Sequence, residues 1–102
     1  MADDAPAGEA DAPVETVRRH LMVSGRVQGV FYRETLRRLA KEKGVVGWAR
    51  NTRDGLEAEI EGPRPVVDEL ITWCRTGPPH AVVIHVQVDE QDPTGSADFR
   101  VR

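Results

Sequence analysis

A short glycine-spaced stretch, Gly25 to Arg33, constrains the fold of this chain more than any other feature of its sequence. It reads Gly-Arg-Val-Gln-Gly-Val-Phe-Tyr-Arg and joins an apolar segment to a helical one. Glycine adopts backbone angles closed to other residues, so consecutive N–H groups in such a turn can converge on one anion. The helix that follows adds its own unpaired N–H groups and the positive end of its dipole. The pattern therefore predicts a strand–turn–helix unit that binds an oxyanion, with the guanidinium of Arg33 as a permanent charge.

Hydrophobic periodicity predicts alternating strands and helices in the rest of the chain. Apolar residues at helical spacing predict helices over 32–43, ended by Gly44 as a C-cap, and over 67–74. The Asp54-Gly55 pair is typical of a hairpin turn between two strands. The expected strands are 17–24, 45–51, 56–61, 82–88 and a short terminal one at 98–101.

The order β-α-β-β-α-β with a short extra strand is that of an α+β, ferredoxin-like split βαβ sandwich. We expect two helices to cover one face of an antiparallel sheet. In strand 56–61 the apolar residues alternate with three glutamates, which predicts one face on the core and one in solvent. If the first strand lies beside the strand ending at Asn51, this residue and the glycine-spaced turn meet at one end of the sheet.

Length and composition predict one domain behind an acidic tail. Residues 1–16 are almost entirely Ala, Asp, Glu, Pro and Gly and include five of the 17 acidic residues, which predicts disorder. The domain then spans 17–102. An acidic N-terminus without an apolar run is unlike a secretion signal, and no later segment approaches the ~20 apolar residues of a membrane span. We expect a cytoplasmic protein that does not enter a membrane.

The charge of the expected domain suits a small anion better than a nucleic acid. All 14 Lys and Arg residues and 12 of the 17 acidic residues lie beyond residue 16, which leaves a formal charge of about +2. Nucleic-acid binding normally requires a concentrated basic face, and we expect none here. A single cysteine, Cys74, permits no intrachain disulfide, and the three histidines show no paired ligand spacing, so we expect no metal.

From residue 17 to residue 102 the sequence resembles the acylphosphatases. The resemblance is long and specific, unlike a lone glycine motif. Its departures are small, chiefly Tyr32 where phenylalanine is usual and Ala49 where a bulkier aliphatic residue is common. The matching segments are Gly25–Val30 followed by two aromatic residues and Arg33, Gly47–Thr52 before an Asp-Gly turn, Glu61–Pro63, Gly77–Pro78 and Phe99–Val101.

The resemblance implies hydrolysis of an acyl phosphate to a carboxylate and inorganic phosphate, without metal or cofactor. By motif position, Arg33 corresponds to the phosphate-binding arginine and Asn51 to the asparagine that orients the attacking water. The implied partners are the small-molecule substrate and a phosphate or sulfate ion in the loop, and monomer is the default expectation. The implied phosphate loop is formed by the backbone of Gly25, Arg26, Val27, Gln28, Gly29 and Val30.

Simpler interpretations of these residues stay open at this point. Arg33 could be a solvated helix cation, Asn51 a turn residue that tolerates left-handed angles, and the glycines mere shapers of a turn. Trp48 and Trp73 are expected to pack against the core, Arg26 to face solvent, and Cys74 to be an inert thiol on the apolar stripe of its helix.

Two other classes of function are possible on this fold. The first is an RNA-binding module, which would need aromatic side chains on the exposed face of the central strands, where this sequence has charged ones. The second is a non-catalytic accessory domain, as found at the front of larger maturation enzymes. Fold alone does not decide between them, because function resides in the site.

Overall fold

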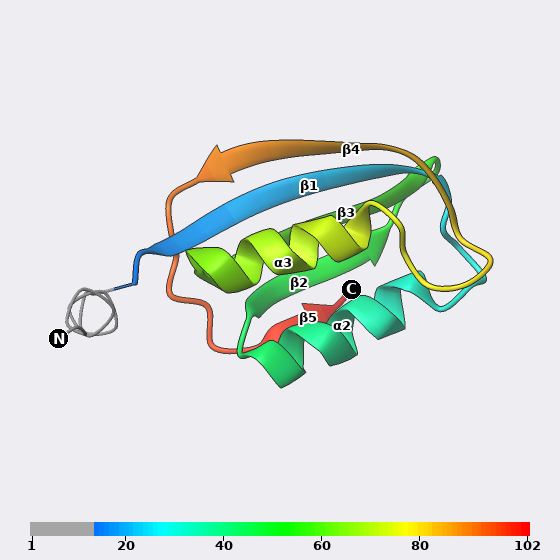
Figure 1. The fold of residues 1–102 in the computed structure, drawn as a ribbon. Helices are drawn as coiled ribbons and strands as arrows, with labels where there is room; N and C mark the ends of the chain where they lie inside the picture. The colour runs from blue at the N-terminus through cyan, green and yellow to red at the C-terminus, as the bar shows by residue number, and fades with distance from the viewer. Residues whose placement is uncertain (1–13) are drawn as a thin grey trace, which may run out of the picture.

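The computed structural model describes residues 14–102, which form a five-stranded sheet with two helices against one face (Figure 1). The predicted elements are all present, and Gly44 ends the first helix as its C-cap. The fourth strand is longer than expected and the third runs through Pro63. The elements are β1 (Thr16–Arg26), α2 (Tyr32–Lys43), β2 (Val46–Asn51), β3 (Gly55–Pro63), α3 (Arg64–Cys74), β4 (Val82–Gln91) and β5 (Phe99–Val101).

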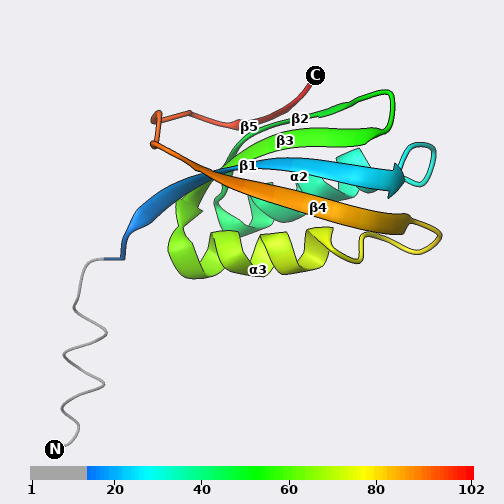
Figure 2. The same cartoon turned by 90° about the horizontal axis from the view of Figure 1, so that it is seen from above.

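The strand order is β4-β1-β3-β2-β5, which confirms the ferredoxin-like plan (Figure 2). The sheet is mixed rather than wholly antiparallel, because β5 pairs with β2 in parallel. The condition that β1 lies beside β2 is not met, since β3 pairs with both strands and lies between them. Both β1 and β2 are antiparallel to β3, however, so they run in the same direction. The β1–α2 loop and the β2–β3 turn therefore lie at one end of the sheet.

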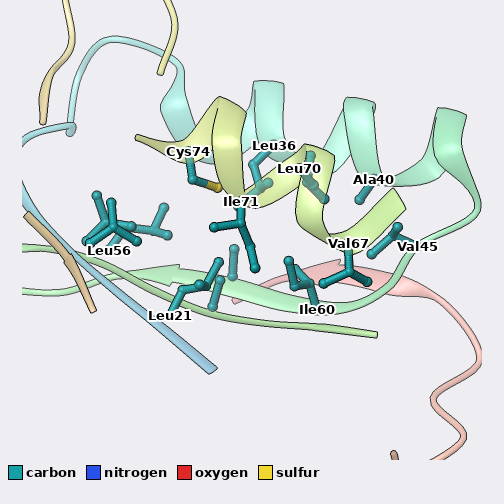
Figure 3. Close-up of a cluster of buried hydrophobic side chains, with 14 of the residues drawn as sticks. Leu21, Leu36, Ala40, Val45, Leu56, Ile60, Val67, Leu70, Ile71 and Cys74 are labelled. Atoms are coloured by element: carbon teal, nitrogen blue, oxygen red, sulfur yellow. The ribbon is translucent and has the colours of Figure 1, made fainter. Parts of the chain in front are cut away.

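The core lies between the sheet and the two helices (Figure 3). Side chains from β1 and β3, such as Leu21 and Ile60, meet Leu36 of α2 and Leu70 of α3, and all four are fully buried. Leu21 pairs with Ala58 on the neighbouring strand, as the alternation in both strands requires. This packing holds the start of α2 in a fixed position relative to the end of β2.

The opposite face of the sheet carries a buried ion-pair network, which differs from the solvated face predicted for the glutamates. Arg18 and Glu61 are only 3% and 5% exposed and form an ion pair at 2.8 Å. The segment between β4 and β5 covers them, and the backbone N–H groups of Thr94 and Gly95 donate to the Glu61 carboxylate at 2.8 and 3.0 Å. Sequence periodicity gives the face of each residue but not the loop that later covers it.

The structure also bears on the start of the domain. Residues 1–13 of the predicted tail lie outside the described residues. Thr16 belongs to β1 and pairs with Pro63, and the Glu15 carboxylate accepts from Arg64 at 2.6 Å. The folded part thus begins before the predicted boundary at residue 17. Within residues 14–102, neither helix is long and apolar enough to cross a membrane.

Candidate functional site

A pocket of about 280 Å³ opens where the β1–α2 loop, the first turn of α2 and the end of β2 meet. It brings together four residues of the predicted site, namely Arg33, Asn51, Val27 and Gly29. The glycine-spaced turn and the asparagine thus lie at one site, although the strands that carry them are not neighbours. The lining residues are Val27, Gly29, Phe31, Tyr32, Arg33, Glu34 and Asn51.

The backbone of the β1–α2 loop has the shape expected of an anion-binding turn. Gly29 and Phe31 adopt positive φ angles of 77° and 63°, whereas Val30 between them does not. Backbone of alternating hand turns successive N–H groups toward one side. None of the hydrogen bonds within residues 14–102 is donated by the backbone N–H of Gln28 or Gly29. The helix begins after Phe31 without a side-chain cap, so the N–H groups of its first turn also lack a side-chain acceptor.

Three hydrogen bonds fasten the end of β1 and this loop to the β2–β3 turn. The Gln28 side chain donates to the backbone oxygens of Thr52 and, at 3.3 Å, of Gly55. The backbone N–H of Gly25 donates to the Asp54 oxygen at 3.2 Å. A side chain at Gly25 would collide with the Val82 oxygen, so this position requires glycine. The loop and the strand that ends at Asn51 are thus held in one geometry.

Arg33 and Asn51 present unpartnered polar atoms at this pocket. Asn51 shares strand parity with the buried residues Gly47 and Ala49, so its side chain points to the helix side of the sheet. Its Oδ1 atom and the Nε atom of Arg33 are buried, and neither has a hydrogen-bond partner within residues 14–102. Buried polar atoms are nearly always paired, and exceptions call for an explanation such as a ligand.

Buried residues at the end of the loop and the start of α2 anchor the loop to the core. Val27 is 1% exposed and belongs to the core. Tyr32 is equally buried, packs against Trp73 with the ring centroids 5.1 Å apart and the planes tilted by 49°, and donates its hydroxyl hydrogen to the Cys74 backbone oxygen at 2.6 Å. Burial raises the pKa of the Tyr32 phenol and raises that of the Cys74 thiol to about 12, so both stay protonated at neutral pH. Cys74 is thus the buried thiol that the sequence predicts, and Tyr32 is a structural support.

Other predicted residues lie beside the pocket rather than in it. Gly25, Arg26 and Gln28 line a more open groove behind the loop, and Arg26 is exposed as expected. Val30 is half-buried against the core. The backbone of these residues forms the end of β1 and the loop, but Arg26, Gln28 and Val30 do not line the pocket.

Apart from the structural Tyr32, two lining residues carry no predicted role in the site. Glu34 places a carboxylate at the pocket of a site proposed to bind an anion, but the nearest Arg37 nitrogen lies 3.6 Å from it. Phe31 stands at the mouth and is 78% exposed. Its place in the glycine motif marks it, but no sequence signal shows that its ring is exposed. The remaining charge at the mouth is that of Arg33, whose Nη1 donates to the Arg102 oxygen at 3.1 Å.

Groups that could hold a metal ion are absent from residues 14–102. His20 instead forms a 2.7 Å hydrogen bond with Glu57 on the sheet face opposite the helices, which we call the open face. The Arg50 guanidinium also contacts Glu57. The pKa of Glu57 lies below its ordinary value, mainly because of the hydrogen bond with His20 and further because of the contacts with Arg50, which together outweigh the opposite effect of desolvation.

Fold and pocket together define a small ferredoxin-like domain with a pocket, lined by Arg33 and Asn51, at the N-terminus of its first helix. The sequence profile described as "Acylphosphatase" matches residues 19–101. The chain belongs to the acylphosphatase family. It is 52% identical over 86 residues to an acylphosphatase of Haloquadratum walsbyi, covering 83% of this chain and 92% of that protein. An acylphosphatase of Rubrobacter xylanophilus is 51% identical over 90 residues, covering 86% and 82% respectively.

Solved structures agree with this assignment. An acylphosphatase from Coxiella burnetii superposes with a TM-score of 0.82 at 39% identity, covering 85% of this chain and 93% of that one. Full-length HypF, solved in a phosphate- and nucleotide-bound form, also superposes with a TM-score of 0.82 at 26% identity. That match covers 90% of this chain but only 12% of HypF. The fold therefore occurs both in proteins of this size and as part of a much larger one.

Proposed function

We propose that this protein hydrolyses acyl phosphates to a carboxylate and inorganic phosphate in the pocket between Arg33 and Asn51. One observation carries the proposal. Arg33 and Asn51 line one pocket beside a helix start without a side-chain cap, and a guanidinium nitrogen of the first and the carboxamide oxygen of the second are buried without a partner within residues 14–102. A phosphoryl group with an attacking water would supply an acceptor for the first atom and a donor for the second.

The phosphoryl group would bind to the β1–α2 loop and Arg33. A loose phosphoryl-transfer transition state spreads charge over the peripheral oxygens, which suits fixed N–H donors and a planar guanidinium. The loop is held by the core and by the β2–β3 turn, so its donors need little reorganisation during the reaction. Family membership supports the same assignment of the loop.

Asn51 would orient the water. Its Oδ1 atom would accept a hydrogen bond from the water, which aims an oxygen lone pair at the phosphorus. The side chain is neutral at every working pH, whereas a carboxylate in its place would repel a dianionic substrate. Because an acyl phosphate has a good leaving group, this mechanism assigns no strong general acid or activated nucleophile to the protein.

A turnover assay tests the proposal. We expect the purified chain of 102 residues to release inorganic phosphate from benzoyl phosphate in the presence of a chelator, with phosphate as a competitive inhibitor. Added divalent metal ions should leave the rate unchanged. Loss of activity on chelation, or noncompetitive inhibition by phosphate, would contradict the mechanism.

The similarity to part of HypF favours a second candidate, a phosphate-binding accessory domain without turnover. The two candidates separate cleanly in the same assay. An accessory domain would bind phosphate, detectable by calorimetry, but would not accelerate the breakdown of benzoyl phosphate above its rate in buffer.

A further inference from the structure

We infer that Phe31 is a specificity-determining residue that contacts the acyl group of the substrate and favours aromatic over small acyl groups. The inference rests on the proposed function and extends it from the phosphoryl group to the rest of the substrate. It is carried by the conformation, the exposure and the position of this one residue.

The conformation and the exposure of Phe31 bring the fold no evident benefit. Phe31 holds a left-handed backbone conformation, with φ 63° and ψ 24°, that glycine or asparagine adopts far more readily. Its side chain is 78% exposed, so the ring contributes little to the core. Strained backbone of this kind clusters at ligand sites, where the surrounding structure maintains it.

The position of Phe31 gives the ring a ligand-facing role. Four large apolar residues within residues 14–102 are strongly exposed, namely Val14, Phe31, Val82 and Ile84, and of these only Phe31 lines the pocket of Arg33 and Asn51. Phe31 also lines a second hollow that continues from the mouth along the exposed side of α2.

This arrangement places the two halves of the substrate. When the phosphoryl group is bound by the loop and Arg33, the acyl group of the same substrate extends out of the pocket opening, where the Phe31 ring lies. An aromatic acyl group can stack on that ring and exclude water from both surfaces. An acetyl group is too small to cover it. Phe31 therefore acts on the affinity for the acyl group and leaves the binding of phosphate unchanged.

Paired substrates test the inference. We expect wild-type protein to favour benzoyl over acetyl phosphate in kcat/KM, mainly through KM. Phe31→Ala should lower kcat/KM about tenfold for benzoyl phosphate, the order expected for losing contact with one ring, and about twofold or less for acetyl phosphate. Phe31→Tyr keeps the ring and should retain the preference. Val14→Ala, at an exposed apolar residue far from the pocket, should change neither value.

Phe31→Asn suits the left-handed backbone, and it separates the loss of the ring from persistent strain. This variant should lose the preference as Phe31→Ala does. Equal losses for both substrates in both variants would overturn the inference, as would an unchanged ratio of the two kcat/KM values.

Binding of phosphonates, measured by calorimetry, keeps the inference testable without turnover. We expect wild-type protein to bind benzylphosphonate more tightly than methylphosphonate, and both Phe31→Ala and Phe31→Asn to bind the two equally. If this pattern holds but benzoyl phosphate is not hydrolysed, the proposed function fails and the role of Phe31 stands. If benzoyl phosphate is hydrolysed but the phosphonates bind equally to wild-type protein, the role of Phe31 fails alone.

Discussion

Two arginines on opposite sides of the same sheet, Arg18 of β1 and Arg33 of α2, differ in how their guanidinium groups are paired. On the open face, the Arg18 guanidinium donates to Glu59 at 2.9 Å, to Glu61 at 2.8 Å and to Ser96 at 3.2 Å. On the helix side, the Nε atom of Arg33 is buried beside a pocket and has no partner within residues 14–102. Both side chains are held by well-packed elements, so flexibility does not explain the contrast.

The contrast separates a structural arginine from a ligand-binding one. The Arg18 guanidinium has all its contacts within the protein, so these contacts stabilise the folded state and need no ligand. The Arg33 guanidinium keeps one contact, from Nη1 to the Arg102 oxygen, but its buried Nε atom has no partner within residues 14–102, a cost that a ligand acceptor would offset. Changes on the open face should therefore alter stability alone, and changes at the pocket should alter activity alone.

The largest effect is expected for Arg33→Lys. A lysine keeps the charge but presents a point ammonium in place of the planar fork, so bidentate contact with the phosphoryl oxygens is lost. We expect kcat/KM for benzoyl phosphate to fall ~10²- to 10³-fold. The melting temperature should stay the same. Arg64→Lys, at an exposed arginine paired with Glu15, is the matched control and should keep full activity. A near-normal rate in Arg33→Lys would remove Arg33 from the site.

A somewhat smaller effect is expected for Asn51→Ala. The variant loses the acceptor that orients water, so kcat should fall about 10²-fold. The inhibition constant of phosphate should stay about the same, and stability should not fall, because a buried unsatisfied oxygen is removed. Asn51→Asp sharpens the test, since its carboxylate should also weaken phosphate binding. Equal loss of turnover and phosphate affinity in Asn51→Ala would mean that Asn51 binds the anion instead.

Glu61→Gln tests the open face in the opposite direction. The variant leaves Arg18 without one of its two carboxylates, and we expect the free energy of unfolding to drop by about 2 kcal/mol. Benzoyl phosphate turnover should be unchanged at a temperature where the variant is folded. Glu42→Gln is the matched control, because Glu42 pairs with Arg38 in an exposed position and should matter by less than about 1 kcal/mol. Urea unfolding gives the free energy of unfolding of the wild type and of both variants. A loss of turnover in folded Glu61→Gln would contradict the view that this face of the sheet affects stability alone.

Local pattern was sufficient to predict the elements and the loop, but not the pairing of strands or the state of the glutamates. Residues 56–61 alternate in the sequence, and Leu56, Ala58 and Ile60 indeed lie in the core. That β3 separates β1 from β2, and that Thr94 and Gly95 close over Glu61, are properties of long-range contacts. Periodicity reports the face of a residue and is silent on its distant neighbours.

The same limit applies to the site. The glycine motif and its resemblance to the acylphosphatases located Arg33 and Asn51, which the pocket brings together. The side-chain bonds from Gln28 to the β2–β3 turn, and the exposure of Phe31, depend on a loop conformation that the residues alone do not specify.

The smallest effect is expected in how the free energy of unfolding depends on pH in the acid range. Desolvation raises the pKa of Glu61, but the bonds from Thr94, Arg18 and Gly95 outweigh it and hold the folded-state pKa below its ordinary value of 4.5. The unfolded chain therefore binds the proton first, so this contribution is present above pH 4.5 and is lost as the pH falls through the folded value. We expect urea midpoints of the wild type to decline below that pH more steeply than those of Glu61→Gln. Arg33→Lys removes no carboxylate, so its curve should follow that of the wild type. If the urea midpoints of wild type and Glu61→Gln decline in parallel below pH 4.5, the ionised Glu61 carboxylate does not stabilise the folded state. The ion-pair network around Arg18 would then not be a source of stability, which contradicts the structural role assigned to it.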